Sequence, residues 1–164
     1  MKQVQKAILK NWSDLWGYKF LFIVWMLLAS ITAKTQETTL AVVGNQSGGI
    51  PAVMKLSELK SVLKAETQRW ANGNRIVIAL MRPNTTVGKT TSSKLYDMSG
   101  DELNKFWMSL VFQGKAPPPK FFNTTSELED YVAQNPGAIG VIDRPLANND
   151  VKIIAIDGKT QFSL

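Results

Sequence analysis

The sequence predicts an α/β domain with a small, mixed and mostly parallel sheet flanked by helices. The first observation is the stretch 106–143, which runs from a helix end through a glycine turn and a proline crossing to a capped helix and a buried strand. The second is the strand 75–81, which is apolar on both faces, as the strands of parallel sheets are. The third is the composition, because 164 residues with 45% hydrophobic and 20% charged side chains suit one folded domain.

Residues 1–33 have the order of a secretory signal. The first 19 residues are polar and carry four lysines, and Phe20–Ala33 is an uncharged apolar run that ends in small side chains. A permanent membrane helix needs about 20 apolar residues, so the run favours a cleaved signal peptide, with an uncleaved anchor as the alternative. We therefore expect a signal at 1–33, a linker at 34–39 and a folded domain at 40–164 in the periplasm, which contacts the membrane only through the N-terminal segment.

The composition excludes several kinds of chemistry. The chain has no cysteine and therefore no disulfide, thiol nucleophile or zinc–thiolate site. It has no histidine, the usual general base near neutral pH and the commonest metal ligand. The carboxylates gather at expected helix starts, where capping accounts for them. We expect a protein that is not an enzyme and has neither a cofactor nor a metal site.

The net charge is +6, and +3 remains when residues 1–33 are set aside. This excess suits an anion-binding protein. No basic stripe with interleaved aromatic side chains accompanies it, so we do not expect a nucleic-acid partner.

The expected elements begin with a short strand at 40–43. The glycine-rich segment 44–49 follows, and it either presents amides to an anion or simply leads away from the strand. A helix is expected at 56–64 with Ser57 as its cap, followed by the strand 75–81.

The helix after residue 99 is well marked. Ser99 and Glu102 have the spacing of a capping box, and an apolar cluster follows in the same helix. We expect its side chains Trp107 and Phe112 to pack in the core. Gly114 ends the helix, because glycine enters the left-handed region freely.

The rest of the chain continues the α/β pattern. Pro117–Pro119 is expected to be a stiff connector, since proline has no amide donor. Ser126 and Glu129 have capping-box spacing and predict the next helix. Apolar strands are expected at 138–142 and 151–156. Asp157-Gly158 then predicts a turn, after which residues 161–164 can pair back as a short strand.

The segment 82–96 (RPNTTVGKTTSSKLY) is the best candidate for a site. It follows a buried strand and precedes a helix, and open α/β sheets bind ligands at such carboxyl ends. Its hydroxyls and helix amides are suitable donors to a tetrahedral oxyanion, and Arg82 or Lys89 can supply positive charge. The alternative is a threonine-rich loop and helix start that is only solvated.

Motifs in this order resemble the phosphate-binding proteins of ABC transporters, which have the type II periplasmic binding protein fold. The motif Phe112-Gln113-Gly114 follows a tryptophan helix, and Pro136–Gly140 precedes Val141, where the family usually has an aromatic residue. A helix beginning Leu56-Ser57 and the turn Trp70–Gly73 match a further stretch. The resemblance implies one lobe of this fold and a periplasmic solute-binding role with phosphate or a similar oxyanion as ligand.

The family carries Arg-x-x-x-Ser-Gly-Thr at the position of Arg82. The arginine is matched here, and Thr86-Val87-Gly88 or Gly88-Lys89-Thr90 replaces the Ser-Gly-Thr element. The resemblance therefore implies an anion site. Its members would be Arg82, Thr85, Thr86, Gly88, Lys89 and Thr90.

Family members have two lobes that close over the ligand, and this chain is about half as long. Three explanations stay open: weak anion binding by one lobe, a second protein chain that supplies the missing lobe, or a cell-envelope accessory or interaction domain that keeps the fold without a ligand. For the last reading, the segment 117–122 and the aromatic cluster beside it are the expected contact surface.

Overall fold

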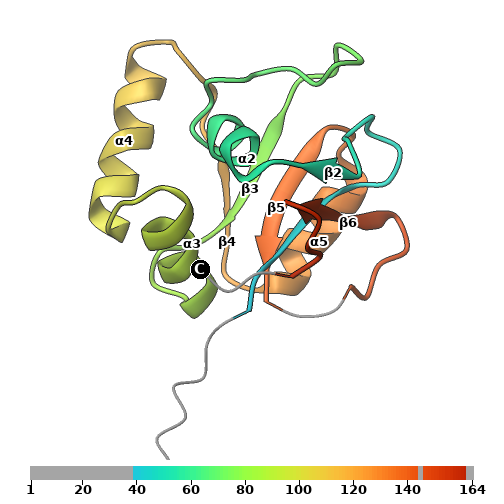
Figure 1. Ribbon diagram of the computed structural model, residues 1–164. Coiled ribbons are helices and arrows are strands. Elements are labelled where there is room, and N and C mark those ends of the chain that lie inside the picture. Colours follow the sequence, from blue (N-terminus) through green and yellow to red (C-terminus); the bar gives the residue numbers. More distant parts are fainter. Residues whose placement is uncertain (1–38, 144–145, 162–164) are drawn as a thin grey trace, which may run out of the picture. The chain divides into compact units, whose positions relative to one another are not determined.

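The computed structural model describes residues 39–143 and 146–161 (Figure 1). The expected signal segment, most of the expected linker and most of the tail strand at 161–164 lie outside these residues. The described part belongs to one unit, Glu37–Leu164, whose centre is a six-stranded sheet of order β2-β6-β1-β5-β3-β4.

The sheet is mixed, as the sequence predicts. Its strands are β1 (Ala41–Asn45), β2 (Val53–Met54), β3 (Val77–Met81), β4 (Lys120–Phe122), β5 (Ala138–Ile142) and β6 (Val151–Ile156). β3 is parallel to β4 and to β5, and β2 is parallel to β6. β1 runs antiparallel to both of its neighbours, β5 and β6. All residues of β1 and β5 are buried, so the centre of the sheet is covered on both faces.

Four helices accompany the sheet in the described residues: α2 (Leu56–Leu63), α3 (Thr86–Leu95), α4 (Gly100–Phe112) and α5 (Thr125–Gln134). α5 packs across β1, β3 and β5, and α3 packs against β3 and β5. α4 packs against α3, and Figure 1 shows it at the outer side of the fold. None of the described helices is long and apolar enough to cross a bilayer.

The capping box at Ser99 is confirmed. The Ser99 side chain accepts a hydrogen bond from the Glu102 amide at 3.3 Å, and the Glu102 carboxylate accepts one from the Ser99 amide at 2.7 Å. The backbone hydrogen bond is the main reason why the pKa of Glu102 lies below its usual value. The start of α4 is therefore fixed by its own first turn.

The starts of α5 and α2 differ from the predictions. The cap of α5 is Thr124 with Glu127, because β4 ends at Phe122 and the chain enters the helix two residues earlier than predicted. Glu129 consequently lies on the inner face of α5, where it is buried and accepts the amides of Ala147 and Asn148 at 2.6 and 2.7 Å. α2 begins after Lys55, whose amide donates to Glu58 at 2.9 Å, so Ser57 is not its cap.

Phe112 is not in the core, contrary to the prediction. Trp107 is 3% exposed, whereas Phe112 is 84% exposed. Two residues five positions apart on a helix with 3.6 residues per turn point about 140° apart, so they cannot both face inward. The buried face of α4 is formed by Leu103 and Trp107.

The end of α3 is joined to α2 by a buried hydrogen bond and a surface ion pair. The Tyr96 hydroxyl donates to the Leu63 carbonyl at 2.8 Å, and burial raises the pKa of Tyr96 well above its usual value. Next to it, Asp97 lies in the left-handed region with φ of 59°. Its carboxylate accepts a hydrogen bond from Lys60 at 2.9 Å, which is the main cause of its lowered pKa.

This ion pair predicts a loss of stability in acid. Because the pKa of Asp97 is lower in the folded than in the unfolded state, the unfolded chain binds more protons as the pH falls through this range. The contribution of Asp97 to the free energy of unfolding is fully present above its ordinary pKa of 3.8. It is lost as the pH falls through the lowered pKa of the folded state. We expect Asp97→Asn, which tolerates the left-handed backbone, to destabilise the protein at pH 7 and to match the wild type once the pH lies below the lowered pKa. Urea unfolding at a series of pH values measures this difference.

Lys60→Gln provides the control. In that background the main partner of Asp97 is gone, so Asp97→Asn should change the free energy of unfolding much less at pH 7. An undiminished effect would show that the ion pair is not its source.

Candidate functional site

Three parallel strands end at one edge of the sheet. β3 is parallel to both β4 and β5, so their carboxyl ends lie at the same side. Arg82 directly follows β3, Asn123 follows β4 and Asp143 follows β5. This is the edge at which open α/β sheets bind ligands, and the predicted site segment begins there.

The turn from β3 into α3 is built by Thr85. Its hydroxyl donates to the Arg82 carbonyl at 2.8 Å and accepts the Gly88 amide at 3.0 Å, and its own amide donates to the Arg82 carbonyl at 2.9 Å. Thr85 is thus the N-cap of α3. The Thr90 hydroxyl donates to the Thr86 carbonyl at 3.0 Å. The hydroxyls of Thr85 and Thr90 are therefore engaged by the backbone of this segment.

Gly88 sets how closely α3 approaches the end of β3. It is buried, and a Cβ atom at this position would clash with the carbonyl oxygen of Arg82. Only glycine allows the first turn of α3 to lie directly against this carbonyl. Gly88 thereby positions the Arg82 backbone.

An open hollow of about 470 Å³ brings Arg82 and Lys89 together. Asn84 and Phe121 also line it, and so does the start of α4 through Ser99, Gly100, Asp101 and Asn104. Both cations are exposed, and within residues 39–143 and 146–161 neither makes an ion pair. The Asp101 carboxylate places one negative charge at the same hollow.

The six predicted site residues are thus divided. Arg82 and Lys89 line the hollow, whereas Thr85, Thr86, Gly88 and Thr90 form the turn and the helix start behind it. Sequence reasoning did not include the polar residues Asn84, Ser99, Asp101 and Asn104. Asn84 could have been included because it belongs to the same loop, but the contribution of α4 depends on its packing against α3.

The glycine-rich segment 44–49 is tied into the fold. The Asn45 side chain accepts the Ser47 amide and hydroxyl at 3.0 Å each. The Gly48 carbonyl accepts the side-chain amides of Asn72 and Asn74 at 3.1 and 3.2 Å. These contacts favour the reading of an ordinary loop over that of an anion cradle.

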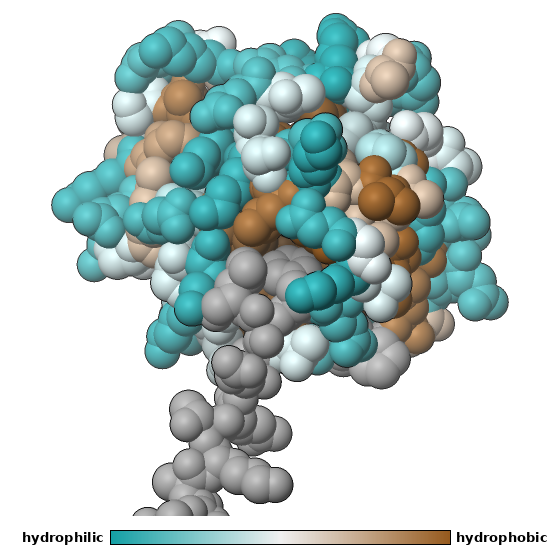
Figure 2. All heavy atoms as spheres, in the orientation of Figure 1, coloured by the Kyte–Doolittle hydropathy of each residue, from teal (hydrophilic) through white to brown (hydrophobic). Residues whose placement is uncertain are grey.

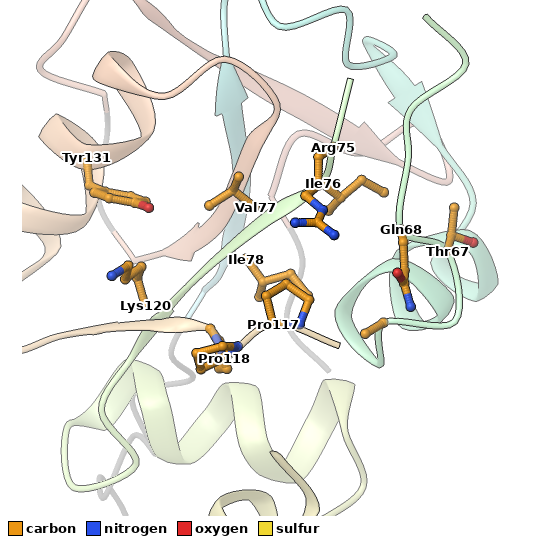
Figure 3. A pocket seen from close by; sticks show the side chains of 12 residues that line it. Thr67, Gln68, Arg75, Ile76, Val77, Ile78, Pro117, Pro118, Lys120 and Tyr131 are labelled. Atoms are coloured by element: carbon orange, nitrogen blue, oxygen red, sulfur yellow. The ribbon is translucent and has the colours of Figure 1, made fainter. Parts of the chain in front are cut away.

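A second hollow, of about 330 Å³, lies beside the amino-terminal half of β3 (Figure 3). Its walls are mainly apolar, from Ile76, Val77, Ile78 and Pro117–Pro119. Arg75 and Lys120 also line it, and Figure 3 shows them apart, at different sides of the opening. The side chains here do not converge on one point, so this hollow is a poorer oxyanion site than the one at Arg82.

Three solved structures share the fold of this chain. An ABC-type phosphate transport receptor from Vibrio cholerae matches with a TM-score of 0.58 and 17% identity, over 80% of this chain and 55% of its own. A putative phosphate ABC transporter substrate-binding protein with bound phosphate from Clostridium perfringens matches with 0.59 and 13%, over 74% and 47%. PstS from Borrelia burgdorferi matches with 0.55 and 16%, over 74% and 48%.

The chain has the type II periplasmic binding protein fold. It spans about half the length of these structures, which is the share expected when one lobe is compared with a protein of two lobes. The neighbours are transport receptors and not enzymes. No family model and no curated protein sequence matches the chain.

The contact at Gly88 predicts the effect of a small substitution. Gly88→Ala should lower the free energy of unfolding by about 2 kcal/mol, because the added methyl group meets backbone that has to move. Thr90→Ala, in the same helix, should change it by about 0.5 kcal/mol or less. Urea unfolding of both variants measures the difference, and equal effects would contradict the close approach.

Proposed function

We propose that this protein binds a tetrahedral oxyanion, with phosphate as the first candidate, in the hollow formed by Arg82 and Lys89. The observation that carries the proposal is that two exposed cations, without ion-pair partners in the described residues, share one hollow at the carboxyl edge of parallel strands. The fold match to phosphate receptors supports the choice of ligand.

The groups around the hollow fit an oxyanion better than a neutral ligand. Arg82 offers a planar fork of donors, and Lys89 adds a second positive charge. The side chains of Asn84, Ser99 and Asn104 can add neutral donors. Asp101 opposes a dianion, so its removal should strengthen binding.

The open form of the hollow sets the expected affinity. A charge–charge contact that is exposed to water is weaker than one that is buried, since the local dielectric constant is higher. We therefore propose weak, salt-dependent binding by this lobe alone and tighter binding where a second protein chain covers the hollow.

The proposed setting is the periplasm. Export would depend on the segment 1–33, and delivery to an ABC transporter is the proposed role, as the fold neighbours are receptors of such systems. We propose that the protein is a binding module and not an enzyme.

A second candidate is a cell-envelope domain that keeps the fold and contacts another protein. The exposed apolar side chains of α4 favour this candidate. Phe121 and Phe122, in the segment that the sequence indicated for such contacts, are only half-buried.

Calorimetric titration with phosphate, and with sulfate for comparison, tests the proposed ligand. We expect saturable heat with phosphate, a loss of about tenfold or more in affinity for Arg82→Ala, and tighter binding for Asp101→Asn. Arg75→Ala is the matched control, because Arg75 is an exposed arginine that precedes β3, whereas Arg82 follows it. Equal losses for both arginine variants would point to a general charge effect, and no heat with either anion would favour the second candidate.

A further inference from the structure

The hollow beside the amino-terminal half of β3 exists because β4 is short. β4 pairs with β3 only from Ala79 onward. The residues before β4 are Pro117–Pro119, and proline has no amide that could continue the ladder toward Val77. The hollow, of about 330 Å³, therefore lies beside the part of β3 that β4 does not reach.

Hydrogen bonds and ring packing hold the walls of this hollow in place. The Gln68 carbonyl accepts the Ile76 amide at 2.9 Å, and the Gln68 side-chain amide donates to the Lys115 carbonyl at 2.6 Å. On the opposite side, the Tyr131 ring packs against Phe122 with 5.1 Å between the ring centroids. Proline and tyrosine rings also have few rotatable bonds, so the hollow is largely formed before a ligand enters.

The charge around the hollow is positive. None of the described residues that line it is acidic, whereas Arg75 and Lys120 both do so. Both side chains are exposed, and neither makes an ion pair within the described part of the chain. Figure 3 shows the two cations at different sides of the opening, with the Arg75 guanidinium directed toward Ile78. Each side of the hollow thus offers one positive charge beside an apolar wall.

The apolar surface of α4 differs from this hollow. Its exposed side chains include Met108 and Phe112, and Figure 2 shows brown and tan residues on the left side of the molecule, where Figure 1 places α4. Those side chains belong to one helix face. The hollow beside β3 has walls from the segment 67–68, from β3 and from the connector, so it can surround a small molecule.

We propose that this hollow binds a small organic carboxylate with an apolar body. The carboxylate lies on Arg75, whose planar guanidinium can donate two parallel hydrogen bonds to it. The apolar body lies against Val77, Ile78 and the proline rings. Because the two cations are apart, the site suits a single negative charge better than a phosphate dianion, for which Arg82 and Lys89 share one hollow.

The size of the hollow limits the ligand. Small-molecule sites range from about 300 to 1,000 Å³, and this hollow lies at the lower end of that range. A short aliphatic chain or a single ring is therefore the expected body of the carboxylate. The inference does not depend on anion binding at Arg82.

Calorimetric titration of the full-length chain with octanoate tests the class of ligand. We expect saturable binding of octanoate. Acetate lacks the apolar body and octanol lacks the charge, so each should bind about tenfold more weakly or worse. No saturable heat with octanoate, or equal affinity for octanol, would overturn the proposal.

Substitutions test the place of binding. Arg75→Gln should lower the affinity for octanoate about tenfold, because the carboxylate loses its charged partner. Arg69→Gln is the matched control and should change the affinity about twofold at most. Arg69 lies opposite Arg75 in a β-bridge and is also exposed, but its guanidinium donates to the Gly73 carbonyl at 2.9 Å and does not line the hollow.

A variant that fills the hollow separates its apolar wall from its charge. Val77 is half-buried, and Val77→Phe should weaken octanoate binding about tenfold, with urea unfolding as the check that the variant is folded. Octanoate binding that survives both Arg75→Gln and Val77→Phe would place the ligand elsewhere on the chain, such as the apolar run 20–33, and would overturn the proposal.

Discussion

The sheet depends on β1, which lies between β5 and β6 and is antiparallel to both. Without this strand the β2–β6 pair would have no link to β5, β3 and β4. Its residues Val42 and Val43 are fully buried, and it ends in a buried asparagine. The side-chain amide of Asn45 donates to the Val132 and Ala133 carbonyls at 3.0 and 2.7 Å, near the end of α5. A polar group can be buried here because its hydrogen bonds are satisfied, and it ties the strand to the helix that covers it.

The sequence predicted the elements that bury a continuous apolar run. The strands at 75–81, 138–142 and 151–156 and the cap at Ser99 are all found, β3 with a start two residues later than predicted. β2 and β4 were not predicted, because they have two and three residues, too few for a period to show. The start of α5 differs from the prediction for the same reason, because the end of β4 determines where the chain enters this helix. Local patterns also contain no information on strand direction, so the antiparallel position of β1 was outside their reach.

The lining of the Arg82 hollow could be foreseen only in part, for a similar reason. The rule that ligands bind at the carboxyl ends of strands pointed to the segment after β3, and the structure brings Arg82 and Lys89 of this segment to one hollow. The rule does not say which hydroxyls turn back to the backbone, and Thr85 and Thr90 do so because the turn and the helix need these hydrogen bonds. The rule also gives no information on the start of α4, which lines the hollow because α4 packs against α3.

Asp101 sets the charge balance of the hollow. It lines the hollow together with Arg82 and Lys89, and it lies in the first turn of α4. A carboxylate in the first turn of a helix is favourable, because it complements the positive end of the helix dipole. The same carboxylate lowers the positive potential that an anion meets in the hollow. The residue that suits the start of α4 therefore opposes the charge of Arg82 and Lys89, and the two requirements meet at one position.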